Sequence, residues 1–135
     1  MRIALVASLF NRDVVDRMLD EALARARKLN ATVVTVVRVP GAFEIPLAVQ
    51  RLLERDDVDG AVAIGAVIKG ETKHDEVIME TTSRALMDIG LRTGKPVGLG
   101  ITGPGMTDEQ AMARTPNAAR AVESVVNMIG LLKGL

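Results

Sequence analysis

Residues 65–76, Gly-Ala-Val-Ile-Lys-Gly-Glu-Thr-Lys-His-Asp-Glu, decide the fold of this chain. They contain the end of an apolar run over residues 61–68, which predicts a strand buried on both faces. Gly70 breaks that run, and Thr72 and Asp75 have the spacing of a capping box, which predicts that a helix begins at Thr72. A strand that passes through a short polar loop into a helix is typical of an α/β protein.

The same connection between strand and helix contains the first candidate for a catalytic residue. Unpaired backbone N–H groups at a helix start favour an anion, phosphate above all. His74, the only histidine in the chain, falls in the first turn of the predicted helix, where it could move protons beside a bound phosphate. These residues equally fit a capped helix with a histidine on the solvated surface, so the connection alone leaves the function open.

Strands and helices alternate along the whole chain, which predicts one α/β domain over residues 1–135. The sheet has four parallel strands with helices on both faces, because such an alternation requires crossover connections. The strands are predicted at residues 2–9, 32–39, 61–68 and 97–101, with a loop over residues 102–106. The helices are predicted at residues 11–30 with Asn11 as N-cap, 43–55, 72–93, 107–114 with a capping box of Thr107 and Gln110, and from Pro116 onward.

The composition argues against several classes of protein. Lys and Arg number 17 and Asp and Glu number 17, so no strong field attracts nucleic acid or an anionic membrane. The absence of cysteine and the single histidine argue against disulfides, thiolate chemistry and a zinc site. No apolar run approaches the length of a membrane span, and we expect a soluble cytoplasmic protein.

Ligands of parallel sheets bind outside the carboxyl ends of the strands. Phe10 follows the first predicted strand, residues 41–44 follow the second, residues 69–74 the third and residues 102–106 the fourth. Phe10 and Phe43 are the only aromatic residues of the chain, and both fall at this edge, which indicates stacking on a flat ring.

Other phosphate-binding folds lack their motifs here. No Gly-rich fingerprint follows the first strand, and the chain has no P-loop with Gly-Lys-Ser/Thr. The acidic residues of a response-regulator receiver are missing, and residues 9–12, Leu-Phe-Asn-Arg, stand where a flavodoxin has a Thr/Ser/Gly phosphate loop. These classes are therefore excluded.

Three motifs together resemble the lumazine synthase family, which acts in riboflavin biosynthesis. They are Phe10-Asn11, residues 39–46 (Val-Pro-Gly-Ala-Phe-Glu-Ile-Pro) and residues 65–74, and the resemblance covers nearly the whole chain in the same order. The sequence Gly-Pro-Gly-Met at 103–106 is similar to the archaeal form. The resemblance implies a flavodoxin-like three-layer sandwich. It also implies condensation of 5-amino-6-(D-ribitylamino)uracil with 3,4-dihydroxy-2-butanone 4-phosphate, without a metal or organic cofactor.

The resemblance also implies a role for individual residues in binding the ribitylaminouracil. Phe10 would stack on the pyrimidine, and Glu44 would accept hydrogen bonds from ribityl hydroxyls. The other residues implied to line this pocket are Ala42, Phe43, Ala66, Val67, Ile68 and Leu99. Leu99 stands where many bacterial members have Phe, so one wall of the pocket is expected to be aliphatic.

The implied phosphate site combines Glu71 and Thr72 at the helix start with Arg114 from a neighbouring subunit. A carboxylate repels a phosphate, so Glu71 is expected to contribute only its backbone. His74 is implied to move protons in the reaction.

The resemblance further implies self-association as a pentamer, with rings that in some members stack into a sixty-subunit shell. The predicted helix over residues 72–93 gives an independent indication, because it is apolar on a second face beside charged residues. Its predicted sheet-facing residues are Ile78, Ala85, Leu86 and Ile89, and the opposite apolar residues are Val77, Met87 and Leu91.

Three alternatives stay open at this point. Archaeal riboflavin synthases resemble the same family and would use lumazine itself, although Asn11 and the intact third motif favour lumazine synthase. A non-catalytic flavin- or lumazine-binding module would keep Phe10 and Glu44 without needing His74 and Arg114 together. A purely structural shell protein would need neither set.

Overall fold

Four strands form one parallel sheet in the computed structural model, which describes residues 1–70 and 73–135. The order across the sheet is β2-β1-β3-β4, so β1 and β3 are central and β2 and β4 form the edges. The strands are β1 (Arg2–Ser8), β2 (Thr32–Val39), β3 (Gly60–Ile68) and β4 (Val97–Met106).

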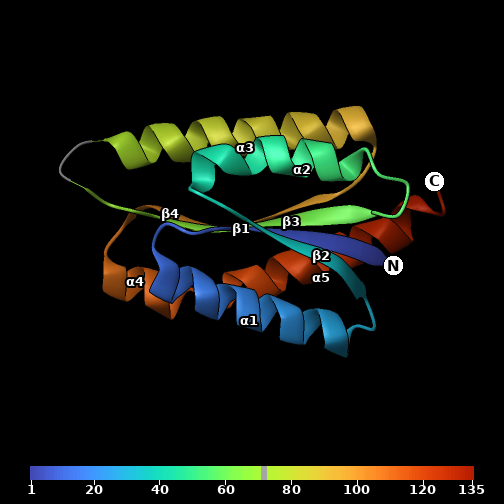
Figure 1. Ribbon diagram of the computed structural model, residues 1–135, viewed down its shortest axis with the longest axis horizontal. Helices are drawn as coiled ribbons and strands as arrows, with labels where there is room; N and C mark the ends of the chain where they lie inside the picture. Colours follow the sequence, from blue (N-terminus) through green and yellow to red (C-terminus); the bar gives the residue numbers. More distant parts are fainter. Residues whose placement is uncertain (71–72) are drawn as a thin grey trace.

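Helices cover both faces of this sheet, which gives the three layers seen in Figure 1. One face carries η1 (Ala42–Glu44), α2 (Ile45–Leu53) and α3 (His74–Thr93); the other carries α1 (Arg12–Lys28), α4 (Asp108–Ala113) and α5 (Asn117–Leu132). The predicted α/β class, with four parallel strands between two helical layers, is confirmed, and the arrangement is consistent with a flavodoxin-like fold.

Strand β3 connects two hydrophobic cores, because its successive side chains point to opposite faces. Val62, Ile64 and Ala66 belong to the core under α1 and α5. Ala61, Ala63 and Val67 belong to the core under α2 and α3. The continuous apolar run is therefore explained by burial on both faces, as predicted from the sequence.

Helix α5 lies so close to β4 that two strand positions must be glycine. A Cβ atom on Gly98 would lie 2.8 Å from both the carbonyl oxygen of Ala121 and a methyl group of Val125. A Cβ atom on Gly100 would lie 3.3 Å from the Cα of Ala118 in α5, and 2.9 Å from the carbonyl oxygen of Ala63 in the neighbouring strand β3. These distances are shorter than van der Waals contact, so the alternate glycines of β4 allow the helix to pack directly on the strand.

The predicted loop over residues 102–106 is wrong, because this segment continues β4. The pairing of β3 with β4 shifts in register between Ala66 and Ile68, and Ile68 then pairs with Met106. Gly103 and Gly105 adopt positive φ angles of 113° and 79°, which lets the strand bend and still pair. The Gly-Pro-Gly sequence therefore marks an irregular strand here, although it is typical of a turn.

Several predicted helix boundaries are also corrected. The helix predicted over residues 43–55 is a short η1 followed by α2, with Pro46 in the first turn of α2 as expected. Pro116 is the N-cap of α5 and not its first helical residue. The capping box of Thr107 and Gln110 is confirmed at the start of α4. No helix in the described part of the chain is long and apolar enough to cross a membrane.

We expect Gly98→Ala to lower the free energy of unfolding by about 1–3 kcal/mol, because the new methyl group has no space beside α5. Thermal or urea unfolding at a fixed protein concentration measures this loss. Gly130→Ala is the matched control, because Gly130 lies in α5 and a Cβ there would meet only a methyl group of Met1, at 3.5 Å. The control should unfold at the same or a higher temperature, and equal losses in both variants would contradict the packing argument.

Candidate active site

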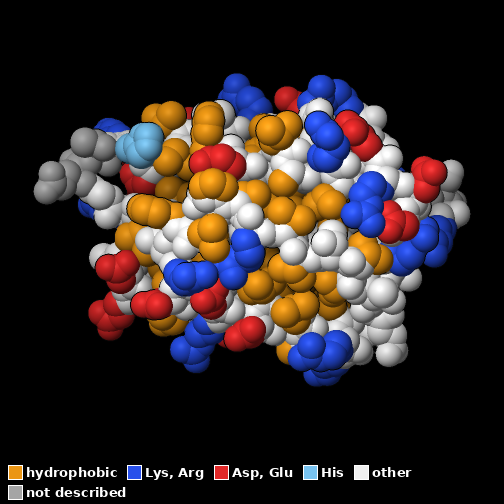
Figure 2. Space-filling model, viewed as in Figure 1, with side chains coloured by type: hydrophobic (Ala, Val, Ile, Leu, Met, Phe, Trp, Pro, Cys, Tyr) orange, Lys and Arg blue, Asp and Glu red, His pale blue; other side chains and the backbone are white. Residues whose placement is uncertain are grey.

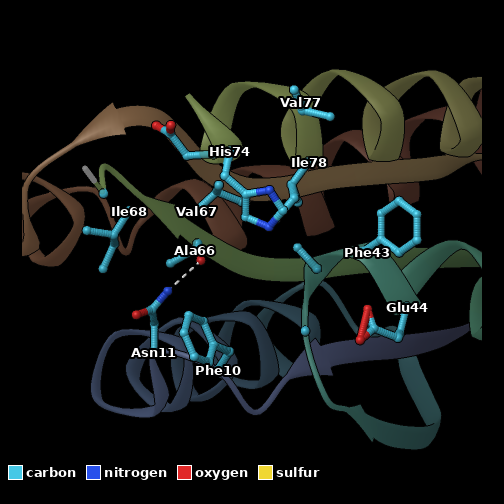
Figure 3. A pocket seen from close by; sticks show the side chains of 14 residues that line it. Phe10, Asn11, Phe43, Glu44, Ala66, Val67, Ile68, His74, Val77 and Ile78 are labelled. Carbon is cyan, nitrogen blue, oxygen red and sulfur yellow. Dashed lines mark hydrogen bonds between the residues drawn. The ribbon is translucent and has the colours of Figure 1, made fainter. Parts of the chain in front are cut away.

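A pocket lies at the edge of the sheet where β1 and β3 end and where η1 and α3 begin (Figure 3). Its volume is about 550 Å³, which is the size of a small-molecule site. The described residues that line it are Phe10, Asn11, Gly41, Ala42, Phe43, Glu44, Ala66, Val67, Ile68, Gly70, His74, Asp75, Val77 and Ile78. The structure therefore brings together the predicted substrate-binding residues other than Leu99, and places His74 with them.

The end of β3 forms an apolar part of the pocket wall. Ala66 and Val67 are 5% and 7% exposed, and Ile68 is half-buried. Asn11 donates a side-chain hydrogen bond of 2.8 Å to the carbonyl oxygen of Ala66, drawn as the dashed line in Figure 3. This bond ties the segment after β1 to the end of β3.

Asn11 is the N-cap residue of α1, as predicted, but its side chain does not cap the helix. Its backbone is left-handed, with φ 59° and ψ 48°, a conformation that asparagine tolerates better than most residues. The side chain points across the sheet edge to Ala66 instead. The cap position was predictable from the sequence but its partner was not, because the two residues are 55 positions apart.

Both aromatic side chains of the protein line the pocket and are exposed. Phe10 is 72% exposed and Phe43 is 61% exposed, although phenylalanine is usually buried. The backbone N–H of Phe10 donates to the carbonyl oxygen of Pro40 at 3.1 Å, so the exposed ring sits on a fixed backbone. Two rings beside a concave apolar surface suit a flat ligand that stacks on an aromatic face.

Glu44 brings a carboxylate to the same pocket at the end of η1. Gly41 lies directly beside this carboxylate, because a Cβ atom on Gly41 would be in van der Waals contact with both oxygens, at 3.8 Å. An ionised carboxylate accepts hydrogen bonds only, and therefore suits the hydroxyl groups of a polyol.

His74 is the first residue of α3, and its ring is turned into the pocket between Val67 and Ile78 in Figure 3. Ile78 follows His74 by one helical turn, so its place beside the ring follows from the spacing of a helix. Glu71 and Thr72, predicted to bind phosphate at this helix start, lie outside the described residues. The predicted capping box of Thr72 and Asp75 therefore has no structural description.

Asp75 has a hydrogen-bond partner on β4 that the sequence did not indicate. It is 7% exposed, and its Oδ2 accepts a hydrogen bond of 2.8 Å from the backbone N–H of Gly105 near the end of β4. The lining residues without a predicted site role are Asn11, Gly41, Gly70, Asp75, Val77 and Ile78.

Leu99 and Arg114 do not line this pocket. Leu99 is 48% exposed on β4 and belongs to a second groove between α3 and α5. Arg114 follows the last residue of α4 and is exposed. Among the described residues that line the first pocket there is no lysine or arginine, so a bound phosphate would lack a permanent cation from them.

The second groove has a volume of about 420 Å³. Met87 and Leu91 of α3 are 65% and 75% exposed at its rim, as the helical pattern predicted for this face. Leu86, which also lines the groove, and Ile89, which faces away from it, are each 3% exposed. Figure 2 shows hydrophobic side chains spread across one face of the molecule with charged groups around them.

No group of three or more His, Cys, Asp or Glu side chains in residues 1–70 and 73–135 is arranged to hold a metal ion. What the described pocket offers is an aromatic face, a carboxylate, backbone groups at the end of β3 and one imidazole. These groups suit the recognition of a flat ring with hydroxyl groups and a proton transfer beside it.

The sequence has close relatives with a shared name. A protein named 6,7-dimethyl-8-ribityllumazine synthase from Staphylothermus marinus is 53% identical over 135 residues, or 99% of this chain and 90% of that protein. Proteins of the same name from Metallosphaera sedula and Methanopyrus kandleri are 52% and 48% identical, each over 100% of this chain and over 90% and 96% of their own lengths. The profile of the family described as 6,7-dimethyl-8-ribityllumazine synthase matches residues 1–133, and the chain belongs to this family.

Proposed function

We propose that this protein is a 6,7-dimethyl-8-ribityllumazine synthase that acts in riboflavin biosynthesis. It condenses 5-amino-6-(D-ribitylamino)uracil with 3,4-dihydroxy-2-butanone 4-phosphate and releases 6,7-dimethyl-8-ribityllumazine, phosphate and water. The observation that carries the proposal is the pocket that combines Phe10, Glu44 and His74 in a chain about half identical to proteins of that name. We place the reaction in the cytoplasm, in line with the expectation from composition.

Each group of the proposed substrate has a chemical counterpart in the pocket. Phe10 stacks on the pyrimidine, and Glu44 accepts hydrogen bonds from the ribityl hydroxyls. The end of β3 offers backbone groups to the polar edge of the ring. The further residues of this proposed subsite are Ala42, Phe43, Ala66, Val67, Ile68 and, from an adjacent chain, Leu99.

The phosphate of the second substrate binds at the start of α3 in this proposal. The helix dipole and the free N–H groups of its first turn attract an anion. Backbone groups of Glu71 and Thr72 hold the phosphate, and Arg114 of an adjacent chain neutralises its charge. The lack of lysine and arginine among the described lining residues supports a cation supplied from another chain.

The chemistry then needs proximity and proton transfers. The 5-amino group attacks the ketone, and loss of water gives an imine. Phosphate is eliminated, the side chain rearranges, and the ribitylamino nitrogen attacks the new carbonyl and closes the second ring with loss of water. His74 donates and accepts protons in these steps, because imidazole titrates near neutral pH. Holding the two substrates together supplies much of the rate enhancement.

The working unit is a ring, for which we propose a pentamer, and rings that stack into a sixty-subunit shell are compatible with the same contacts. The exposed apolar groove beside Leu99, with Met87 and Leu91 at its rim, supports an interface of this kind. In such a ring one chain supplies the ring and ribityl contacts, and the next chain supplies Leu99 and Arg114.

Purified protein mixed with both substrates should form lumazine and release one phosphate per lumazine, without added metal and unaffected by a chelator. Absorbance at the lumazine band and a phosphate assay measure the two products. Formation no faster than the uncatalysed reaction would contradict the proposal, and binding of lumazine without turnover would then favour a binding module. Riboflavin formed from lumazine alone would favour a riboflavin synthase.

We expect His74→Ala to lower kcat by about 10²-fold, the lower end of what a positioned acid-base group contributes. The fold should remain intact, because His74 is an exposed residue at the start of a long helix. Glu76→Ala, an exposed substitution in the same turn, is the control and should keep wild-type turnover. Unchanged turnover in His74→Ala would remove the residue from the mechanism.

A further inference from the structure

Asp75 is a buried carboxylate that the proposed reaction does not use. It follows His74 directly in the first turn of α3 and is 7% exposed. Burial of a charged group is unfavourable unless hydrogen bonds compensate it. The backbone N–H of Gly105 donates to its Oδ2 at 2.8 Å, across 30 positions of sequence. This hydrogen bond has a short, well-formed distance, so the contact can fix the two segments.

The end of β4 binds two segments, the residue after β3 and the first turn of α3. The backbone N–H of Lys69 donates to the carbonyl oxygen of Met106 at 2.7 Å. Gly105, one residue earlier in β4, binds Asp75 in the first turn of α3. The same short piece of β4 therefore holds both residue 69 and the first turn of α3.

The close approach of this strand piece depends on glycine. A Cβ atom on Gly103 would lie 2.2 Å from the carbonyl oxygen of Val67, a residue of the pocket wall. Gly105 has a φ of 79°, in the region that favours glycine, and offers its N–H to Asp75. Residues 103–106 are thus a backbone support packed against the back of the pocket.

The bond of Asp75 holds the helical turn from which the side chain of His74 extends. Successive residues of an α-helix differ by about 100° around the axis. The Asp75 side chain is held at β4, and the ring of the neighbouring His74 lies in the pocket, as Figure 3 shows. A first turn without this bond can rotate or fray, because helix ends lack part of their internal hydrogen bonds.

We propose that Asp75 is a positioning residue for catalysis: through the N–H of Gly105 it holds His74 and the start of α3 in register with β4. This inference rests on the proposed function, because it assigns Asp75 a role in that reaction. Asp75 itself transfers no proton and contacts no substrate in this account. Its effect on turnover passes through the orientation of the imidazole.

The test combines Asp75→Ala, Asp75→Asn and the control Glu76→Ala. Asp75→Ala should lower kcat by about 10-fold or more, since small misplacements of a reacting group cost up to 10²-fold. Its KM for the ribitylaminouracil should stay near the wild-type value, because Phe10 and Glu44 are unaffected. Asp75→Asn keeps a side-chain oxygen for the Gly105 N–H and should recover most of kcat. Equal kcat in the wild type and Asp75→Ala would overturn the proposal.

A double-mutant cycle separates positioning from a general structural effect. In a His74→Ala background, Asp75→Ala should cause little further loss, because the group that it positions is already gone. A full additional loss in this background would overturn the proposal. The wild-type rate in the same assay tests the proposed function separately, so failure of the enzyme assignment is distinguishable from failure of the Asp75 assignment.

A measurement that does not depend on enzyme activity completes the test. Hydrogen exchange of the peptide over residues 102–106, followed by mass spectrometry, should be slow in the wild type, faster in Asp75→Ala and slow again in Asp75→Asn. Equal protection in all three would overturn the role of the bond whether or not the protein is active. If Asp75→Ala does not fold, Asp75→Glu replaces it, because a longer side chain displaces the acceptor while keeping the charge. Wild-type kcat and exchange in that variant would also overturn the proposal.

Discussion

Burial of β3 on both faces is the constraint on which the rest of the structure depends. Every residue of the strand from Gly60 to Val67 is buried, so both faces of the sheet must be covered by helices. Polar side chains cannot be placed along such a strand, because buried polar groups need partners. The chemistry is therefore confined to the carboxyl end, where β3 emerges beside Asn11 and continues toward His74.

Predictions from the sequence succeeded where a local pattern carries the information. The apolar run of β3 and the two aromatic residues after β1 and β2 correctly indicated the sheet and the edge that holds the pocket. They failed where the partner is distant in sequence. The bond between Asp75 and Gly105 was not indicated by the sequence, and residues 102–106 were assigned to a loop but pair with β3. Local sequence patterns do not predict contacts of this kind, because they form only when segments distant in sequence come together in the fold.

The pocket of one chain supplies a stacking ring, a carboxylate and an imidazole, whereas the proposed reaction also needs a cation for phosphate. Arg114 and Leu99 lie away from the pocket. Arg114 follows the last residue of α4, and Leu99 lines the exposed apolar groove beside β4. The proposed oligomer would account for both facts at once, because it would cover the groove and bring the cation from the neighbouring chain. Heterologous contacts form a ring when the rotation between neighbouring chains closes. In the proposed enzyme, two chains therefore form each site.

Complementation between two inactive variants tests this claim most directly. Phe10→Asp places a charge where the ring should stack, and Arg114→Glu reverses the proposed cation; both positions are exposed, so both variants should fold. Hybrid oligomers, co-expressed with two tags and purified through both, should recover activity, since about one quarter of the interfaces in a randomly mixed ring join two intact halves. Hybrids as inactive as either parent, or a wild-type monomer that keeps full activity after dissociation, would contradict a shared site.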